Sequence, residues 1–288
     1  MIKTGLFDTI GALVYQPDET LLLIIRGVAG RNTEILDGAW RASHLSSLRT
    51  VLEKDARMNE QGVSRQPLAE QSVLVWDVPT RIFHWLLVAL IVASLVTGNV
   101  GGLTFMRIHM LSGYAILALI LFRVIWGFIG NTHARFSNFV AGPLTAIGYA
   151  RGLVSGSGRA YLGHNPLGGW SVLVMLVLML VQAATGLCAN DDIFTEGPLA
   201  GRVGKATSDF LTGIHQTNAN LLYVVMAVHV IAVLGYLFKG DNLIRPMITG
   251  RKRVADSAAD REAPGRYAVR ALIAIAISVA IVVGVVNL

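Results

Sequence analysis

Residues 214–238 run for 25 positions without a formally charged side chain. A helix of this length can cross the hydrocarbon core of a bilayer. His215 and His229 lie within it, 14 residues apart. At 100° per residue they face within about 40° of each other, and the helical rise separates them by roughly 21 Å. The segment therefore predicts a transmembrane helix with one histidine toward each membrane surface, and ionisable side chains at such depths usually mark a working site.

Four more apolar stretches extend this character to the rest of the chain. They predict spans at residues 82–103, 109–130, 170–189 and 267–288. Hydrophobic residues make up 53% of the sequence and charged residues 15%, with a mean hydropathy of +0.58, far from the composition of a soluble domain. The predicted fold class is all-α: a polytopic membrane protein with a four-helix transmembrane bundle and a fifth, C-terminal transmembrane helix.

Basic residues are distributed unevenly between the loops. Loops 131–169 and 239–266 together carry ten Lys or Arg residues, whereas the loops after the first and third spans carry three. The positive-inside rule places the basic loops in the cytoplasm and, with them, the N-terminus of a multi-pass protein in the bacterial inner membrane. No apolar core follows a basic start at Met1, so no cleavable signal peptide is expected.

Composition excludes several classes of cofactor and partner. Cys188 is the single cysteine, which rules out an internal disulfide, a CxxCH haem attachment site and a cysteine-ligated iron–sulfur cluster within this chain. The segment GSGRAY at residues 156–161 has tyrosine where a dinucleotide-binding fingerprint needs its third glycine. The net charge of +6 is attributed to cytoplasmic loops, and no nucleic-acid partner is expected.

Four histidines fall into two pairs when they are placed by depth. His84 enters from the cytoplasm with the first span, and His229 lies toward the inner end of the fourth. His109 and His215 open spans that begin outside. Charge bias and helical rise thus predict an inner pair, His84 with His229, and an outer pair, His109 with His215.

The spacing of 14 residues recurs on the first two spans. Gly98 follows His84 by 14 residues, Arg123 follows His109 by 14, and Gly113 lies one turn beyond His109. A flat macrocycle needs small residues where it crosses a helix backbone, although close helix packing is an equally good reason for the glycines. A cation inside a span needs a partner, so Arg123 is predicted to meet an anion near the inner pair, with snorkelling to the interface as the alternative.

Bis-histidine haem b fits opposed imidazoles at two depths. Neutral imidazole is an axial ligand of haem iron and needs no covalent attachment motif. Zinc prefers three or four ligands at one depth, and a proton relay needs carboxylates that the spans lack. The sequence therefore predicts a haem-binding bundle with two haem b groups. Three further cations could hold propionates or anchor the spans at the interface: Arg81, Arg107 and Arg135.

Six segments carry a family resemblance: VWDVPTRIFHW, RIHMLSGY, ARFSNFVAGP, YLGHNPLGG, the two histidines of the fourth span, and NLIRPMITGRK. Together and in this order they resemble the prokaryotic cytochrome b561 family, which includes the cytochrome b subunits of nickel-iron hydrogenases. The resemblance covers about residues 72–253. It implies a four-helix core, electron exchange with quinone or a redox protein, and b-type haem at His84, His109, His215 and His229.

The chain is accordingly predicted to have three parts. Residues 1–74 form an N-terminal cytoplasmic extension of unknown role, residues 75–253 form the cytochrome b561-like four-helix domain, and residues 254–288 form a linker and the fifth transmembrane helix. The extension and the fifth helix depart from the family pattern.

The leading interpretation of function is a dihaem b-type cytochrome acting as a subunit of an oxidoreductase. It would transfer single electrons across the membrane between the quinone pool and a protein partner: a hydrogenase, a dehydrogenase or a c-type cytochrome. Membrane lipid and quinone are further expected partners, and a homodimer is an open arrangement. Two alternatives remain. One is a stand-alone quinone-reducing oxidoreductase that acts on an outer-side substrate such as superoxide, and the other is a haem-free, histidine-lined transporter.

Other polar residues are weaker candidates. His133 and His164 lie in loop 131–169 without a partner at membrane depth, so a structural or partner-facing role outweighs contact with a cofactor or quinone. His44 lies in the N-terminal extension and is expected to be solvated. Hydrogen bonds between helices are the first expectation for three polar span residues, ahead of a role in orienting a quinone or an imidazole: Gln182, Asn218 and Asn220.

Overall fold

Five long apolar helices dominate a computed structural model that describes residue 50 and residues 71–155, 161–254 and 267–288. Each helix is long and apolar enough to cross a membrane. In chain order they are α4 (Val78–Val100), α5 (Leu103–Ile129), α8 (Pro166–Gly186), α10 (Lys205–Phe238) and α12 (Tyr267–Val286). The predicted all-α, polytopic class is confirmed. Most of the predicted N-terminal extension, including His44, lies outside the described residues.

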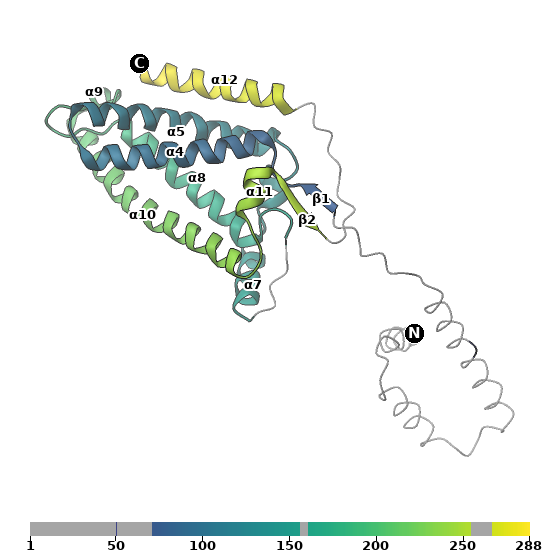
Figure 1. Cartoon of the computed structure of the whole chain (residues 1–288). Helices are drawn as coiled ribbons and strands as arrows, with labels where there is room; N and C mark the ends of the chain where they lie inside the picture. Colours follow the sequence, from purple (N-terminus) through teal and green to yellow (C-terminus); the bar gives the residue numbers. More distant parts are fainter. Residues whose placement is uncertain (1–49, 51–70, 156–160, 255–266) are drawn as a thin grey trace, which may run out of the picture. The chain divides into compact units, whose positions relative to one another are not determined.

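Helix α5 is the centre of the bundle. It packs against α4, α8 and α12, while α10 packs against α8 (Figure 1). Its side chains supply much of the main core, with Ile120 and Trp126 fully buried and Phe122 nearly so. The other spans expose most of their apolar side chains, as expected for helices whose outer faces contact lipid.

Four spans begin earlier than the apolar pattern predicts, and the difference is largest in α10 and α5. Helix α10 starts at Lys205 instead of residue 214, and α5 starts at Leu103 instead of residue 109. An ion pair between Lys205 and Asp209, one turn apart, supports the polar first turns of α10. With 34 residues, α10 is about 50 Å long and exceeds the hydrocarbon thickness, so its first turns extend into water.

The start of α4 is fixed by Asp77. Its Oδ1 accepts the backbone N–H of Thr80 at 2.7 Å, which caps the helix, and Pro79 occupies the first turn. Its Oδ2 accepts the indole N–H of Trp126 at 3.1 Å, near the end of α5. Both oxygens of this buried carboxylate therefore accept hydrogen bonds, and they join the start of α4 to the end of α5.

A short antiparallel pair of strands, β1 (Gln71–Leu74) and β2 (Arg251–Val254), joins the two ends of the core. Between β2 and the preceding helix α11 (Ile244–Thr249), Gly250 has a φ of +81° and its carbonyl accepts the N–H groups of Val75 and Trp76. Only glycine adopts this φ without strain, and an added Cβ would meet the Trp76 carbonyl oxygen at 2.8 Å. The sequence pattern did not predict either strand.

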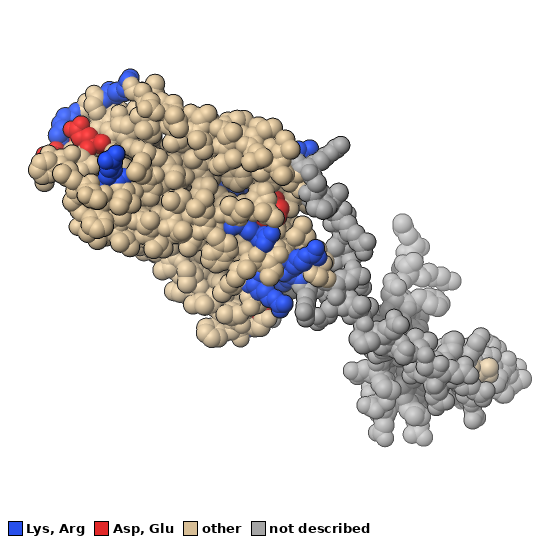
Figure 2. Space-filling view, turned by 45° about the horizontal axis from the view of Figure 1, so that its top comes forward, with Lys and Arg blue, Asp and Glu red and all other residues tan. Residues whose placement is uncertain are grey.

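The loops contain three further short helices, α6 (Phe136–Phe139), α7 (Pro143–Val154) and α9 (Ala200–Val203). Charged side chains gather toward the two ends of the bundle, with a broad band of other residues between them (Figure 2). This distribution is typical of a membrane-spanning bundle whose ends lie in water.

Candidate functional site

The outer pair of histidines meets between α5 and α10. The ring centroids of His109 and His215 lie 6.2 Å apart, with the ring planes at 84°. A first-row metal ion binds an imidazole nitrogen at about 2 Å, so two axial imidazoles on opposite sides of one ion have ring centres roughly 6 Å apart. The observed separation therefore fits one iron between the two rings.

Both outer imidazoles are held through the same ring nitrogen. Nδ1 of His109 lies 2.9 Å from the carbonyl oxygen of Ser94, and Nδ1 of His215 lies 2.9 Å from the carbonyl oxygen of Gln182. A neutral imidazole that donates Nδ1–H to a carbonyl keeps its Nε2 lone pair for a metal. The two helix carbonyls thus select the tautomer that an axial ligand requires.

Glycines make room for these rings. A Cβ added at Gly98 would lie 2.8 Å from Nδ1 of His109, and one added at Gly186 would lie 2.9 Å from Cε1 of His215. Gly113 has no atom within 4 Å of an added Cβ. All three glycines and both histidines line a cavity of about 490 Å³, which is within the size range of small-molecule and cofactor sites.

A polar network continues from the outer cavity along α8 and α10. Asn218 donates to Oε1 of Gln182 at 2.7 Å and to the Leu178 carbonyl at 2.9 Å. Nε2 of Gln182 lies 3.0 Å from Nε2 of His215. Asn220 also lines this cavity. Gln182 and Asn218 therefore make the predicted contacts between helices, and Gln182 also touches the histidine.

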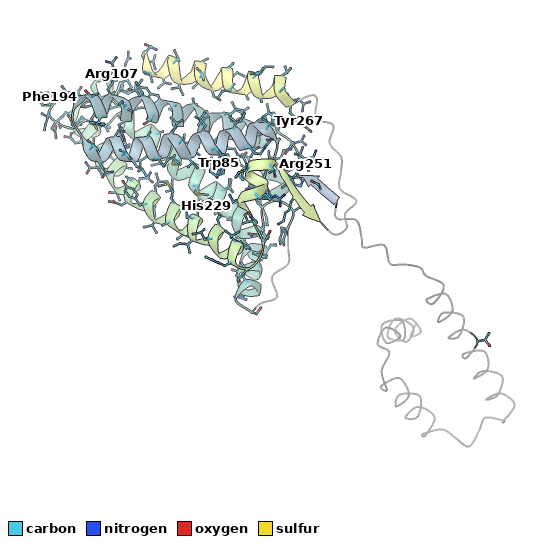
Figure 3. The ribbon with its side chains drawn as sticks, viewed as in Figure 1. Trp85, Arg107, Phe194, His229, Arg251 and Tyr267 are labelled. Atoms are coloured by element: carbon cyan, nitrogen blue, oxygen red, sulfur yellow. The ribbon has the colours of Figure 1, made fainter. Side chains whose placement is uncertain are left out.

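The inner pair consists of His84 on α4 and His229 on α10, which lie close enough for their imidazoles to interact electrostatically. Nδ1 of His84 is buried and has no hydrogen-bond partner. Trp85 packs edge-on against His84, with ring centroids 5.0 Å apart. Figure 3 shows Trp85 and His229 toward the bundle end that carries Arg251, and Arg107 and Phe194 at the opposite end. The two pairs thus occupy different depths.

Arg123 is buried near the inner end of α5, with 3% of its surface exposed. Its guanidinium carbon lies 5.1 Å from the ring centre of Phe136 and 5.7 Å from that of Phe139. Nη1 has no hydrogen-bond partner. Among the described residues no carboxylate lies within ion-pair distance of Arg123, so this cation lacks the direct anionic contact that its burial demands.

The other predicted arginines have different surroundings. Arg81 donates from Nη1 to the Ile248 carbonyl at 2.6 Å, and Arg135 donates from Nε to the Gly130 carbonyl at 2.8 Å. Arg107 is exposed at the outer end of α5. Arg81 and Arg135 thus hold backbone segments at the inner end.

Sequence reasoning missed the groups that orient the ligands. The role of the Ser94 carbonyl cannot be recognised from the sequence, because any residue at that position supplies a backbone carbonyl. The sequence pattern also gives no reason to place Gly186 against His215. His164 was given a minor role, yet it lies against Trp76 and Phe139, with ring centroids 4.7 and 4.6 Å away.

Comparisons with known proteins identify relatives of the chain. The sequence profile of the family described as prokaryotic cytochrome b561 matches residues 75–250. A probable Ni/Fe-hydrogenase B-type cytochrome subunit from Rhizobium leguminosarum bv. viciae is 27% identical over 227 residues, covering 66% of this chain and 92% of the relative. Proteins with the same description from Azotobacter chroococcum mcd 1 and Azotobacter vinelandii are 25% and 26% identical, each covering 70% of this chain and 97% of the relative. No solved structure matches the chain.

Proposed function

The chain belongs to the prokaryotic cytochrome b561 family, and from this premise we propose that it is a dihaem b-type cytochrome that passes single electrons across the membrane. As a b-type cytochrome it serves electron transfer; the number of haems and the route are our proposal. The observation that carries it is the separation of 6.2 Å between the rings of His109 and His215, each with Nδ1 already held by a carbonyl.

At the outer site, His109 and His215 would be the two axial ligands. When bound, haem b supplies a one-electron couple between ferric and ferrous iron. The Ser94 and Gln182 carbonyls keep the ligand rings oriented, and a hydrogen bond from Nδ1–H raises the basicity of a ligand imidazole. Gly98 and Gly186 allow the rings to approach the helices, and the cavity beside them would receive the porphyrin.

At the inner site, His84 and His229 would be the axial ligands and Arg123 would meet a propionate. The support is the buried, unpartnered state of the Arg123 Nη1 atom and the His84 Nδ1 atom. His229 lies 14 residues after His215 on α10, which separates the two ligand positions by roughly 21 Å along the helix. Electrons would therefore cross the bilayer in two steps along one helix.

A hydrogenase or a comparable dehydrogenase is the proposed redox partner, with quinone at the other end of the path. The support is the description of the relatives, which are probable Ni/Fe-hydrogenase B-type cytochrome subunits. The basic inner loops support an inner-membrane protein with a cytoplasmic N-terminus. A homodimer remains compatible with this role.

The superoxide alternative has less support. A catalyst that attracts a small anion at its outer surface gains from a net positive approach. Here Lys205 is paired with both Asp192 and Asp209, so this outer cation is neutralised locally. Membership in a cytochrome family also argues against a haem-free transporter.

A reduced-minus-oxidised difference spectrum of the purified full-length chain tests the proposal. We expect b-type bands, and a haem assay should give two haems per chain. A folded but colourless protein would overturn the proposed function. One haem per chain would refute the dihaem arrangement.

A further inference from the structure

Five buried side-chain atoms lack a hydrogen-bond partner among the described residues, and all belong to inner-end segments. They come from the first turns of α4, from the inner half of α5 and from the loop just before α8: Thr80 Oγ1, Arg81 Nε, His84 Nδ1, Arg123 Nη1 and His164 Nδ1. Buried polar groups are almost always satisfied in folded proteins. The polar groups of the inner site therefore lack hydrogen-bond partners. At the outer site, by contrast, the Nδ1 atoms of both histidines are hydrogen-bonded.

Arg123 and His164 belong to one cluster. The Phe139 ring lies between them, 5.7 Å from the Arg123 guanidinium carbon and 4.6 Å from the His164 ring. Trp76 closes the other side of His164 at 4.7 Å. The two groups approach from separate segments, α5 and the residues before α8, and share the aromatic ring of Phe139. Apolar surroundings of this kind strengthen any electrostatic contact made within them.

Asp77 interacts with Arg123, yet among the described residues the two form no direct ion pair. Asp77 is buried and interacts electrostatically with Arg123, but its two oxygens already accept the Thr80 N–H and the Trp126 indole N–H. Burial, with Arg123 and His133 adding to it, lowers the pKa of His164 to about 3, so the ring is neutral at physiological pH. The cluster therefore offers one cation and one neutral donor to an incoming acceptor.

We propose that Arg123 and His164 together bind one carboxylate of the inner haem, and that His164 is a positioning residue for the redox potential of that haem. This inference rests on the proposed dihaem function and assigns a role to a loop histidine. A carboxylate accepts charge-assisted hydrogen bonds from a guanidinium and a further bond from an imidazole N–H. These donors offset the negative charge of the propionate, which otherwise favours ferric over ferrous iron.

Redox titration of the full-length protein, with the two haems followed separately by their optical bands, tests the inference. In Arg123→Gln we expect the ferrous-to-ferric ratio of one haem to fall about tenfold at fixed ambient potential, which corresponds to about 59 mV for a one-electron couple. In His164→Leu the same haem should shift in the same direction by a smaller factor. His164→Gln, which keeps a donor, should recover part of the shift, and Arg123→Lys should recover part of the Arg123→Gln shift.

The neighbouring histidine supplies the control. His133→Leu should leave both potentials unchanged, because Nδ1 of His133 is not among the buried atoms that lack a partner. Equal shifts in the His133 and His164 variants, or no shift in the His164 and Arg123 variants, would overturn the inference while a normal dihaem spectrum leaves the proposed function intact. Loss of all b-type absorbance from the unmodified protein would instead defeat the proposed function.

A second arm identifies the source of the carboxylate. Protein produced without haem is reconstituted either with haem b or with its dimethyl ester, whose propionates cannot accept as carboxylates. We expect His164→Leu to shift the inner potential with haem b and not with the ester. An equal shift with both forms, or a shift that appears only when inorganic phosphate is added, would mean that a free anion occupies the cluster and would refute the propionate assignment.

Discussion

Trp126 donates its indole N–H to Oδ2 of Asp77 at 3.1 Å, although 49 residues separate them. The bond ties the inner end of α5 to the cap of α4, where Oδ1 of the same carboxylate holds the Thr80 N–H. One buried acid thus fixes the angle at which α4 enters the bundle and, with it, the position of His84 two turns later.

Replacing this acid should therefore weaken the bundle. We expect Asp77→Ala to lower the free energy of unfolding by about 2–4 kcal/mol, because it removes a helix cap and leaves a buried indole N–H without an acceptor. Thermal unfolding in detergent measures the change. Asp209→Ala, which removes an exposed ion pair, is the control and should change the free energy of unfolding far less. Equal losses in the two variants would contradict the structural role of Asp77.

Removal of an outer ligand should cost one haem. We expect His215→Ala to bind one haem per chain instead of two, because it removes the imidazole whose ring centre lies 6.2 Å from that of His109. The remaining haem should keep its midpoint potential. A pyridine haemochrome assay on purified protein measures the content, and His133→Ala should retain both haems. Retention of both haems by His215→Ala would disprove the outer assignment.

The glycines of the outer cavity allow a graded test. Gly186→Ala should displace the His215 ring, because the added Cβ would meet Cε1 at 2.9 Å, so outer haem occupancy should fall at least severalfold. The Cβ added by Gly113→Ala meets no protein atom within 4 Å, so this variant should impair haem binding only if the porphyrin crosses that backbone. Gly148→Ala, which also has open space and lies on α7 away from the cavity, is the control. Haem titration of protein made without haem measures all three.

An acid-sensitive loop lies beside the outer cavity. Oδ1 of Asp191 accepts the backbone N–H groups of Thr195, Ile193 and Phe194, and these bonds lower the pKa of Asp191 from 3.8 to about 2. Because the folded pKa lies below the unfolded one, the stabilisation is complete above pH 3.8 and is lost as the pH falls through about 2. At neutral pH, Asp191→Ala should expose the same amides.

Hydrogen exchange at the amides of Phe194 and Thr195 measures this loop. We expect faster exchange in Asp191→Ala than in the unmodified protein, with little change at the Gly240 amide, which bonds to the Leu237 carbonyl at the other membrane surface. Unchanged protection of Phe194 would show that the carboxylate does not order the loop. The exposed positions of Ile193 and Phe194 in this loop would then need another physical cause.

Much of the architecture could be predicted because its signals are local. Long uncharged stretches were sufficient for the fold class. The uneven placement of Lys and Arg and the helical rise predict the depths of the four histidines. The span boundaries were less accurate, since the first turns of α10 are polar and stable only as part of a helix that extends into water.

The surroundings of the histidines could not be predicted in the same way. The carbonyls of Ser94 and Gln182 and the position of His164 depend on which helix faces which, and that depends on packing between distant segments. The β1–β2 pair joins residues about 180 positions apart in strands of only four residues, too short to leave a pattern.

That strand pair has a consequence for how the family core has been extended. The profile match starts at residue 75, directly after β1, and ends at residue 250, directly before β2. The chain therefore enters and leaves the matched core through two strands that are hydrogen-bonded to each other. The pairing of β1 with β2 places the two ends of the matched region side by side. The core is thus a unit whose two ends lie next to each other. A circular permutant with its natural ends linked and new termini in an outer loop should therefore retain the haem cavity.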